Sequence, residues 1–196
     1  MTAPVVDGRA ARKAATRDAI ADALLDLLHE GNPRPTAREI AARAGISLRS
    51  VYVHFDDLED LFCVAARRHY ARVAPMLEPA STDGPLATRA GAFVRRRVGI
   101  YTQLGPVGRA TALQAPFSPT LARIVQDAQT RGRREIEQMF ETELAPLAAD
   151  AQVRTVALIA VLTGIDAWET LHDEYALSDD EIVETVVAAI LSELAS

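Results

Sequence analysis

The segment from Thr36 to Phe55, which reads TAREIAARAGISLRSVYVHF, constrains the fold of this chain more than any other. Thr36 and Glu39 form a T-x-x-E capping box, which predicts that a helix starts between them. Gly45 follows that helix at a place where a chain often needs a positive φ, and Ser47 is a natural N-cap for a second short helix. This order of features predicts a helix-turn-helix, the unit that lays its second helix in the DNA major groove.

The second helix, Leu48 to Phe55, has two faces that its spacing separates. Val51 and Phe55 are four residues apart and are expected in the core, with Leu48 at the edge of the same stripe. The outward positions hold Arg49, Ser50, Tyr52 and His54. Capping boxes and this apolar spacing occur in most helical proteins, so a plain piece of an all-α core is the alternative on pattern alone.

A further helix is expected upstream, from about Arg17 to Glu30, with Thr16 as its cap. From Thr16 to Phe62 the chain resembles the TetR family of bacterial transcriptional regulators, and the Tyr-x-His-Phe ending of the second helix carries much of that resemblance. The resemblance implies an all-α fold. It pairs an N-terminal three-helix helix-turn-helix DNA-binding domain with a C-terminal helical ligand-binding and dimerisation bundle.

Three parts of the chain are expected on this basis. Residues 1–15 would be a flexible basic N-terminal arm, residues 16–62 the DNA-binding domain, and residues 63–196 the helical effector-binding and dimerisation domain. The basic residues near the start could follow the phosphates or enter the minor groove, or they could belong to a solvated tail. These residues are Arg9, Arg12, Lys13 and Arg17.

The resemblance also implies roles for single residues on a double-stranded DNA operator. Tyr52 and His54 would bond phosphate oxygens. Arg49 and Ser50 would face base edges, while Arg38 would reach a base or a phosphate. The predicted DNA-binding residues are Arg38, Ser47, Leu48, Arg49, Ser50, Tyr52 and His54.

Leu58 departs from the family's pattern. The family usually has Lys here, in an F-x-x-K-x-x-L pattern, where it contacts phosphate, and in this chain acidic residues surround the position. Asp56 and Glu59 are explained as a cap and its partner at the start of the next helix. The missing cation predicts a shallower salt dependence of DNA binding, and whether it also weakens the affinity is left open by the sequence.

The net charge of −6 looks wrong for a DNA-binding protein, but its distribution explains it. Residues 1–55 hold eight Lys and Arg against six Asp and Glu, whereas the other 141 residues hold 13 against 21. DNA binding needs a local basic face rather than a basic whole.

Cys63 is the only cysteine, so no intramolecular disulfide is possible, and a small buried hydrophobic role is expected for it. No secretory signal is evident and the longest apolar run, Val156 to Ile165, is too short for a bilayer, so a cytoplasmic protein without a membrane partner is expected.

No strand pattern is convincing, and two helices close the chain. One is expected from about Ala151 to His172, and the other starts at the capping box of Ser178 and Glu181. The last helix carries a wide apolar stripe of Ile182, Val183, Val186, Val187, Ile190, Leu191 and Leu194. The resemblance implies that these two helices pair with their copies in a homodimer, while a monomeric core helix is the alternative.

A helical body attached to a DNA-binding domain suggests a pocket for a small-molecule effector, which would shift the population of DNA-binding geometries and release a repressor. Each candidate residue is of a type found more often in a plain core than against a ligand. The candidates are His69, Phe93, Tyr101, Gln114, Phe117 and Trp168.

Nothing in the sequence predicts an enzyme, a cofactor or a metal site. The four histidines have no metal-binding spacing, and Lys13 is the only lysine, so neither a phosphate-binding loop nor a Schiff-base lysine fits the helical body. The alternatives to a regulator are a helical protein-interaction module that has lost DNA binding and, with less support, a small all-α enzyme.

Overall fold

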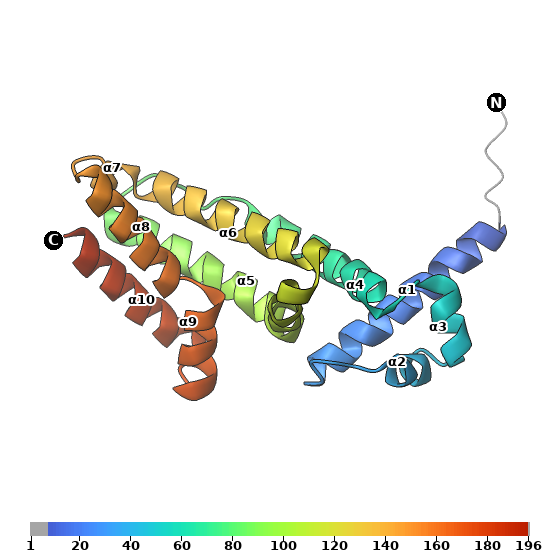
Figure 1. Ribbon diagram of the computed structural model, residues 1–196. Coiled ribbons are helices and arrows are strands. Elements are labelled where there is room, and N and C mark those ends of the chain that lie inside the picture. The colour runs from blue at the N-terminus through green and yellow to red at the C-terminus, as the bar shows by residue number, and fades with distance from the viewer. Residues whose placement is uncertain (1–7, 196) are drawn as a thin grey trace, which may run out of the picture. The chain divides into compact units, whose positions relative to one another are not determined.

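The structure is a computed structural model that describes residues 8–195, and every regular element in that range is helical (Figure 1). The α-helices are α1 (Gly8–His29), α2 (Ala37–Arg43), α3 (Leu48–His54), α4 (Leu58–Val73), α5 (Leu86–Gln114), α6 (Pro119–Met139), α7 (Glu141–Leu144), α8 (Ala149–Leu162), α9 (Ile165–Glu169) and α10 (Asp179–Leu194). Short 3-10 turns cover Ala74–Leu77 and Ala115–Phe117, and a π turn covers Thr170–Glu174. The predicted all-α fold class is confirmed.

The chain forms two compact units. The first takes the chain up to Arg72 together with Leu104–Arg123, and the second takes Val73–Gln103 together with the chain from Ile124 onward. Helices α5 and α6 therefore pass from one unit to the other. The boundary expected at residue 62 falls inside α4 and does not coincide with this division.

Helix α1 begins earlier than the sequence predicts. It starts at Gly8, so the described part of the expected N-terminal arm, residues 8–15, is helical and not an arm. Thr16 does not cap it, because its hydroxyl donates to the carbonyl of Arg12 inside the helix, at 3.0 Å. Residues 1–7 of the predicted arm lie outside the described residues.

The first three helices share one apolar core. α1 buries Ile20, Leu24 and Leu28 on one face, and α2 and α3 pack against α1 and each other through the fully buried Ile40 and Val51. This arrangement is needed because a seven-residue helix is not stable alone, so α2 and α3 depend on packing for their helical form.

The turn between α2 and α3 has the geometry that its glycine predicts. Gly45 has φ +67°, its N–H donates to the carbonyl of Ala42, and the N–H of Ile46 donates to that of Ala41. These two bonds form a Schellman motif, which closes the C-terminus of α2 and turns the chain into α3.

The second unit is built around an aromatic pair. Phe93 of α5 and Phe140, which follows α6, are fully buried and meet edge to face, with ring centroids 5.7 Å apart. The apolar stripe of α10 packs into the same cluster, where Ile182 and Ile190 are fully buried and Leu191 is partly buried. Most of that stripe is therefore covered by its own chain.

The single helix expected from Ala151 to His172 is wrong. α8 begins at Ala149 and ends at Leu162, and α9 begins at Ile165. Gly164 separates them, because its ψ of 164° is extended and it serves as the N-cap of α9.

No single described helix has the length and apolar composition to cross a membrane. α8 reaches that length and composition only together with residues 165–174, and the two segments are bent by 42°.

Candidate nucleic-acid interface

The helix-turn-helix begins at a complete capping box. The N–H of Glu39 donates to the Thr36 hydroxyl at 3.3 Å, and the N–H of Thr36 donates to the Glu39 carboxylate at 2.7 Å. The hydroxyl of Thr36 also donates to that carboxylate, and these hydrogen bonds lower the pKa of Glu39 below its usual 4.5. The box fixes where α2 starts and therefore where α3 is presented.

Ser47 caps α3, as its sequence position predicts. Its hydroxyl accepts from the N–H of Ser50 at 3.1 Å and lies 2.9 Å from the Ser50 hydroxyl. Both serines are therefore engaged with each other at the N-terminus of α3. That end carries the positive pole of the helix, which favours an approaching phosphate.

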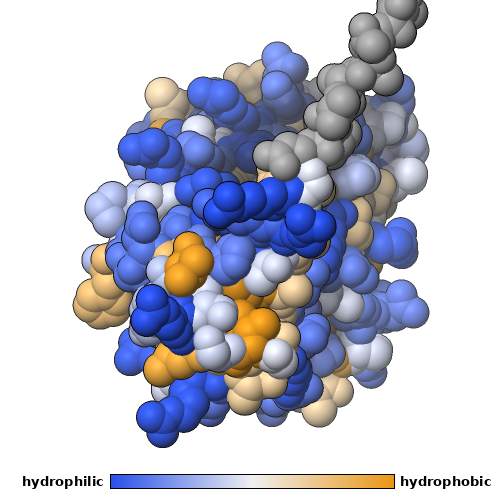
Figure 2. Space-filling view, turned by 90° about the vertical axis from the view of Figure 1, so that its right-hand side faces the viewer, coloured by the Kyte–Doolittle hydropathy of each residue, from blue (hydrophilic) through white to orange (hydrophobic). Residues whose placement is uncertain are grey.

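Helix α3 separates buried from exposed side chains as its spacing predicts. Val51 and Phe55 are 1% and 2% exposed, whereas Arg49 and Tyr52 are exposed. Leu48, at the start of the helix, is 40% exposed. Figure 2 shows the end of the molecule that carries this helix, where a few apolar side chains lie among mostly hydrophilic ones.

The sequence prediction missed Val53. It is 65% exposed, and it stands four residues after Arg49, so both lie on one face of α3. An exposed valine there offers a methyl surface for the C5-methyl group of thymine. Its spacing from Arg49 was the signal that could have found it.

Arg17 does not belong to a free basic arm. Its guanidinium donates to the backbone carbonyl of His54 at 2.6 Å, pairs with Asp60 at 3.2 Å and lies 4.2 Å above the ring of Phe55. A carbonyl at the C-terminus of a helix has no helical partner, so a cation satisfies it there. Arg17 thus ties α1 to the end of α3 and the start of α4.

His54 is placed differently from its outward-facing neighbours. It is half-buried, and its Nδ1 is buried without a hydrogen-bond partner among the described residues. Arg38, on α2, is exposed. The structure thus presents Arg38 more openly than His54.

The acidic stretch before α4 has structural roles in place of the missing lysine. Asp57 caps α4, since its carboxylate accepts from the N–H of Asp60 at 2.8 Å; the predicted cap, Asp56, is wrong by one residue. Asp60 is paired with Arg17. Leu58, which occupies the position of the family's usual lysine, is 37% exposed and carries no charge.

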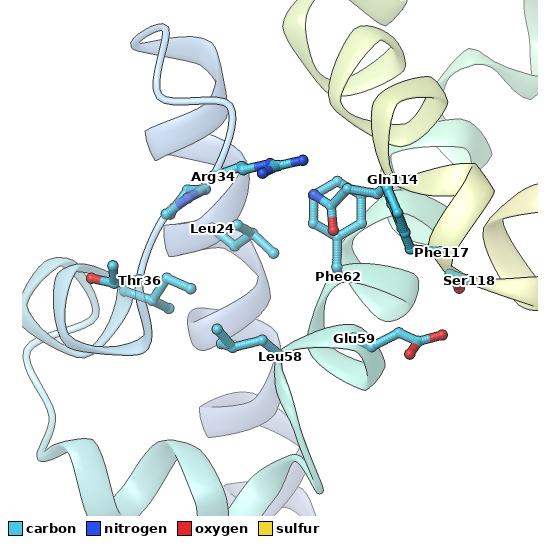
Figure 3. Close-up of a pocket in the computed structure, with 11 residues that line it drawn as sticks. Leu24, Arg34, Thr36, Leu58, Glu59, Phe62, Gln114, Phe117 and Ser118 are labelled. Carbon is cyan, nitrogen blue, oxygen red and sulfur yellow. The ribbon is translucent and has the colours of Figure 1, made fainter.

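The six predicted ligand residues do not form one pocket. His69 is buried in the first unit, where its Nε2 lies 3.2 Å from the carbonyl of Leu104, and Phe93 is in the core of the second unit. Gln114 and Phe117 line a groove in the first unit (Figure 3). The remaining two, Tyr101 and Trp168, lie 6.3 Å apart between ring centroids in the second unit.

Tyr101 and Trp168 border a narrow space of about 10 Å³. The Tyr101 hydroxyl donates to the carbonyl of Thr163 at 2.8 Å and accepts from Arg97 at 3.2 Å. The indole N–H of Trp168 is buried and has no hydrogen-bond partner among the described residues. Trp168 stacks on His172, with ring centroids 5.0 Å apart.

Within residues 8–195 no group of three or more His, Cys, Asp or Glu is placed to hold a metal ion. Cys63 is buried with its sulfur 4.0 Å from the Ser118 hydroxyl, and burial raises the pKa of its thiol. A raised pKa disfavours the thiolate, which is the reactive form of cysteine.

Known proteins share this architecture. Residues 20–63 match the family model of the bacterial regulatory proteins of the tetR family. A tetR-family transcriptional regulator from Streptomyces coelicolor has a similar structure, with 20% identity, 93% of this chain and 81% of that chain covered, and a TM-score of 0.72. A transcriptional regulator from Rhodococcus sp. Rha1 has 20% identity, 91% and 96% covered, and a TM-score of 0.70. A TetR-like transcriptional regulator from Rhodococcus sp. RHA1 has 15% identity, 93% and 97% covered, and a TM-score of 0.64. No curated protein sequence matches.

The capped helix-turn-helix and the helical remainder define a DNA-binding regulator with an all-α body. The family match covers the helix-turn-helix itself, and the structural likeness extends over nearly the whole chain. Residues 20–63 therefore match the tetR family of bacterial regulatory proteins, and the resemblance found in the sequence is confirmed.

Proposed function

We propose that this chain is a transcriptional repressor that binds a two-fold symmetric operator as a homodimer and is released by a small molecule. Residues 16–62 are the DNA-binding domain in this proposal, and residues 63–196 carry dimerisation and effector binding in the bacterial cytoplasm. The observation that carries it is the outward row on α3: Arg49, Tyr52 and Val53 are exposed while Val51 and Phe55 anchor the helix in the core. A helix held in this way can enter the major groove without rearranging.

The proposed contacts divide by chemistry. Arg49 is the candidate for reading guanine, because a guanidinium can bond its O6 and N7 together. The Tyr52 hydroxyl and the N-terminus of α3 suit phosphate oxygens, which position the helix without reading sequence. Leu48 and Val53 suit thymine methyl groups. The full proposed set is Arg38, Ser47, Leu48, Arg49, Ser50, Tyr52, Val53 and His54.

The test is operator binding by the double variant Arg49→Ala, Tyr52→Ala. Mapping where the protein sits on its own genome supplies the operator, and fluorescence anisotropy measures the affinity. The variant should bind at least about a hundredfold more weakly, since each good base contact contributes about 1–3 kcal/mol. The matched control is Arg123→Ala, Tyr175→Ala, which removes the same side-chain types from exposed positions outside α3. Equal affinities for both variants would favour the protein-interaction alternative.

The proposed dimer uses the last two long helices, with α8 supplying the apolar surface. Val153, Leu158 and Val161 on α8 are 58%, 41% and 68% exposed. The apolar stripe of α10 packs into the core of its own chain. α10 therefore contributes the small exposed side chains Ala188 and Ser192 to the proposed dimer contact. Small residues let helices approach closely, and a self-complementary patch of this kind suits a two-fold axis. A single DNA-binding domain reads too few base pairs to be specific. Two copies double the number of base pairs that are read.

The proposed effector site is the space beside Tyr101 and Trp168 in the second unit. The buried, unpaired indole N–H of Trp168 is a donor that a polar ligand atom could satisfy. The space is too small for an organic molecule, so a ligand has to select a conformation in which it is open. An effector that binds there should lower operator affinity by the same factor by which the operator lowers effector affinity. A compound that binds without changing operator affinity would contradict the release mechanism.

A further inference from the structure

A groove in the first unit offers a second place for a ligand, distinct from the space beside Trp168. It has a volume of about 450 Å³, within the range of small-molecule sites (Figure 3). Its floor is made by Leu24 of α1, Ile40 of α2 and Phe62 of α4, which are 2%, 1% and 4% exposed. All of the residues that line it belong to the first unit, so the groove is part of the unit that holds the helix-turn-helix.

The rim of the groove leaves apolar surface in water. Phe117, in the turn between α5 and α6, is 78% exposed, and Leu58 at the start of α4 is 37% exposed. The ring of Phe117 contributes little to the core of this unit, because most of its surface is in water. A molecule in the groove would cover Phe117 and remove that apolar area from water.

One end of the groove is cationic. Figure 3 shows Arg34 extending from the loop before α2 across the groove toward Gln114. The Arg34 backbone N–H donates to Asn32, but its guanidinium makes no ion pair or hydrogen bond with another described residue. Glu59 lies at the other end and directs its carboxylate away from Arg34. A free guanidinium beside apolar walls is suited to a carboxylate, which it can bond with two N–H groups.

We propose that this groove binds a small aromatic carboxylate, with the carboxylate on Arg34 and Gln114 and the ring against Phe62 and Phe117. The proposal does not depend on DNA binding or on the effector site in the second unit. Thr36 and Ile40 also line the groove, so a bound molecule touches the cap and the first turns of α2. Occupancy therefore reaches the helix-turn-helix through direct contact, without a signal from the second unit.

The test uses 2-naphthoate as the probe and the full chain, with binding measured by isothermal titration calorimetry. The neutral isostere 2-naphthalenemethanol should bind at least about tenfold more weakly, because it cannot form the charge-assisted bonds to Arg34. Arg34→Gln should weaken naphthoate binding by about the same factor and leave the alcohol unchanged. Arg123→Gln, an exposed arginine outside the groove, is the matched control and should have no effect on either probe.

Phe117→Ala tests the apolar wall. It should weaken both probes at least about tenfold, since a buried ring is lost from the site. Leu113→Ala is its control, because Leu113 is also exposed, at 53%, but does not line the groove. Both side chains are exposed, so neither substitution should prevent folding, and circular dichroism checks this.

Three results would overturn the proposal. Saturable binding that none of the groove variants changes would place the probe elsewhere. No binding at millimolar probe would exclude this ligand class. A change of oligomeric state in Phe117→Ala without probe binding would assign the exposed ring to a contact between copies of the chain.

Discussion

Helices α3 and α8 both expose apolar side chains, but the residues around those side chains differ. On α3, Val53 and Tyr52 lie beside Arg49, with the Ser47 hydroxyl at the start of the helix. On α8, Val153 and Val161 share their exposed surface with the small Ala157 and Ala160. The one exposed arginine of α8, Arg154, is already paired with Asp150 at 2.7 Å.

Exposed apolar surface therefore does not identify a partner by itself. A DNA groove presents hydrogen-bonding edges, phosphates and scattered methyl groups, which match the mixed surface of α3. The face of α8 around Val153 and Val161 presents apolar and small side chains, which match the same face of a second copy. Because the neighbours of the exposed side chains differ, we propose DNA as the partner of α3 and a second copy of the chain as the partner of α8.

The largest expected effect is on self-association. Val161→Glu places a charge in the proposed apolar contact, where burying it unpaired costs about 3 kcal/mol or more. The dimer dissociation constant should rise at least about a hundredfold, and sedimentation velocity over a concentration series measures it. Tyr175→Glu is the matched control, since Tyr175 is also 68% exposed but lies after the π turn and outside α8. If the natural protein is monomeric at every concentration, the exposed apolar face of α8 is not a contact between copies.

The second prediction concerns how rigidly α3 is presented. Arg17→Gln removes the cation that bonds the carbonyl of His54 and pairs with Asp60. Because Arg17 is 37% exposed, we expect a loss of only about 1 kcal/mol, and a fall in melting temperature of about 2–4 °C. Operator affinity should fall a few fold, since the end of α3 is less firmly held.

Arg12→Gln is the control for Arg17→Gln. Arg12 is exposed on the same helix, and its guanidinium makes no hydrogen bond or ion pair with another described residue. If Arg12→Gln lowers operator affinity but not the melting temperature, the first turns of α1 contact DNA directly. If both variants behave alike in both measurements, Arg17 does not act by positioning α3.

Local rules in the sequence predicted the helix-turn-helix well. Caps and turns depend on a few neighbouring residues, so Thr36, Gly45 and Ser47 could be assigned before any contact was known. The start of α1 could not be assigned in this way. Thr16 looks like a cap, but the alanine-rich stretch before it is helical, and Thr16 bonds inside the helix.

The candidate sites were harder to predict because they depend on contacts far apart in sequence. The role of Arg17 comes from His54 and Asp60, which follow it by 37 and 43 residues. Residue type alone suggests the six ligand candidates, and the fold separates them into different places. The break at Gly164 was missed because the apolar pattern continues across it.

The third prediction adds a positive charge at the start of α4, which follows α3 in the chain. Leu58→Lys restores the cation usual in the family, and the slope of log affinity against log salt should become steeper by about one unit. Leu113→Lys adds the same charge at an exposed site of the first unit, outside the predicted contacts. Equal slopes for the natural protein and Leu58→Lys would show that position 58 does not reach a phosphate. An equal increase in both variants would show only a general effect of charge.

The smallest expected effect compares the capping boxes that support the two surfaces. Hydrogen bonds from Thr36 lower the pKa of Glu39, and those from Ser178 lower the pKa of Glu181, each below the usual 4.5. A carboxyl group with a lowered pKa in the folded state contributes stability above pH 4.5 and loses it as the pH falls through that lowered value.

Both groups are exposed, so each effect on the melting temperature should be small. Glu39→Gln and Glu181→Gln should each lower the melting temperature at pH 6, and the difference from the natural protein should shrink as the pH falls below 4.5. Only Glu39→Gln should also weaken operator binding at pH 6, because α2 carries α3 whereas α10 supports α8. An equal loss of operator affinity in both variants would mean that the two surfaces are not independent, and that the geometry of the dimer, rather than the capping of α2, limits DNA binding.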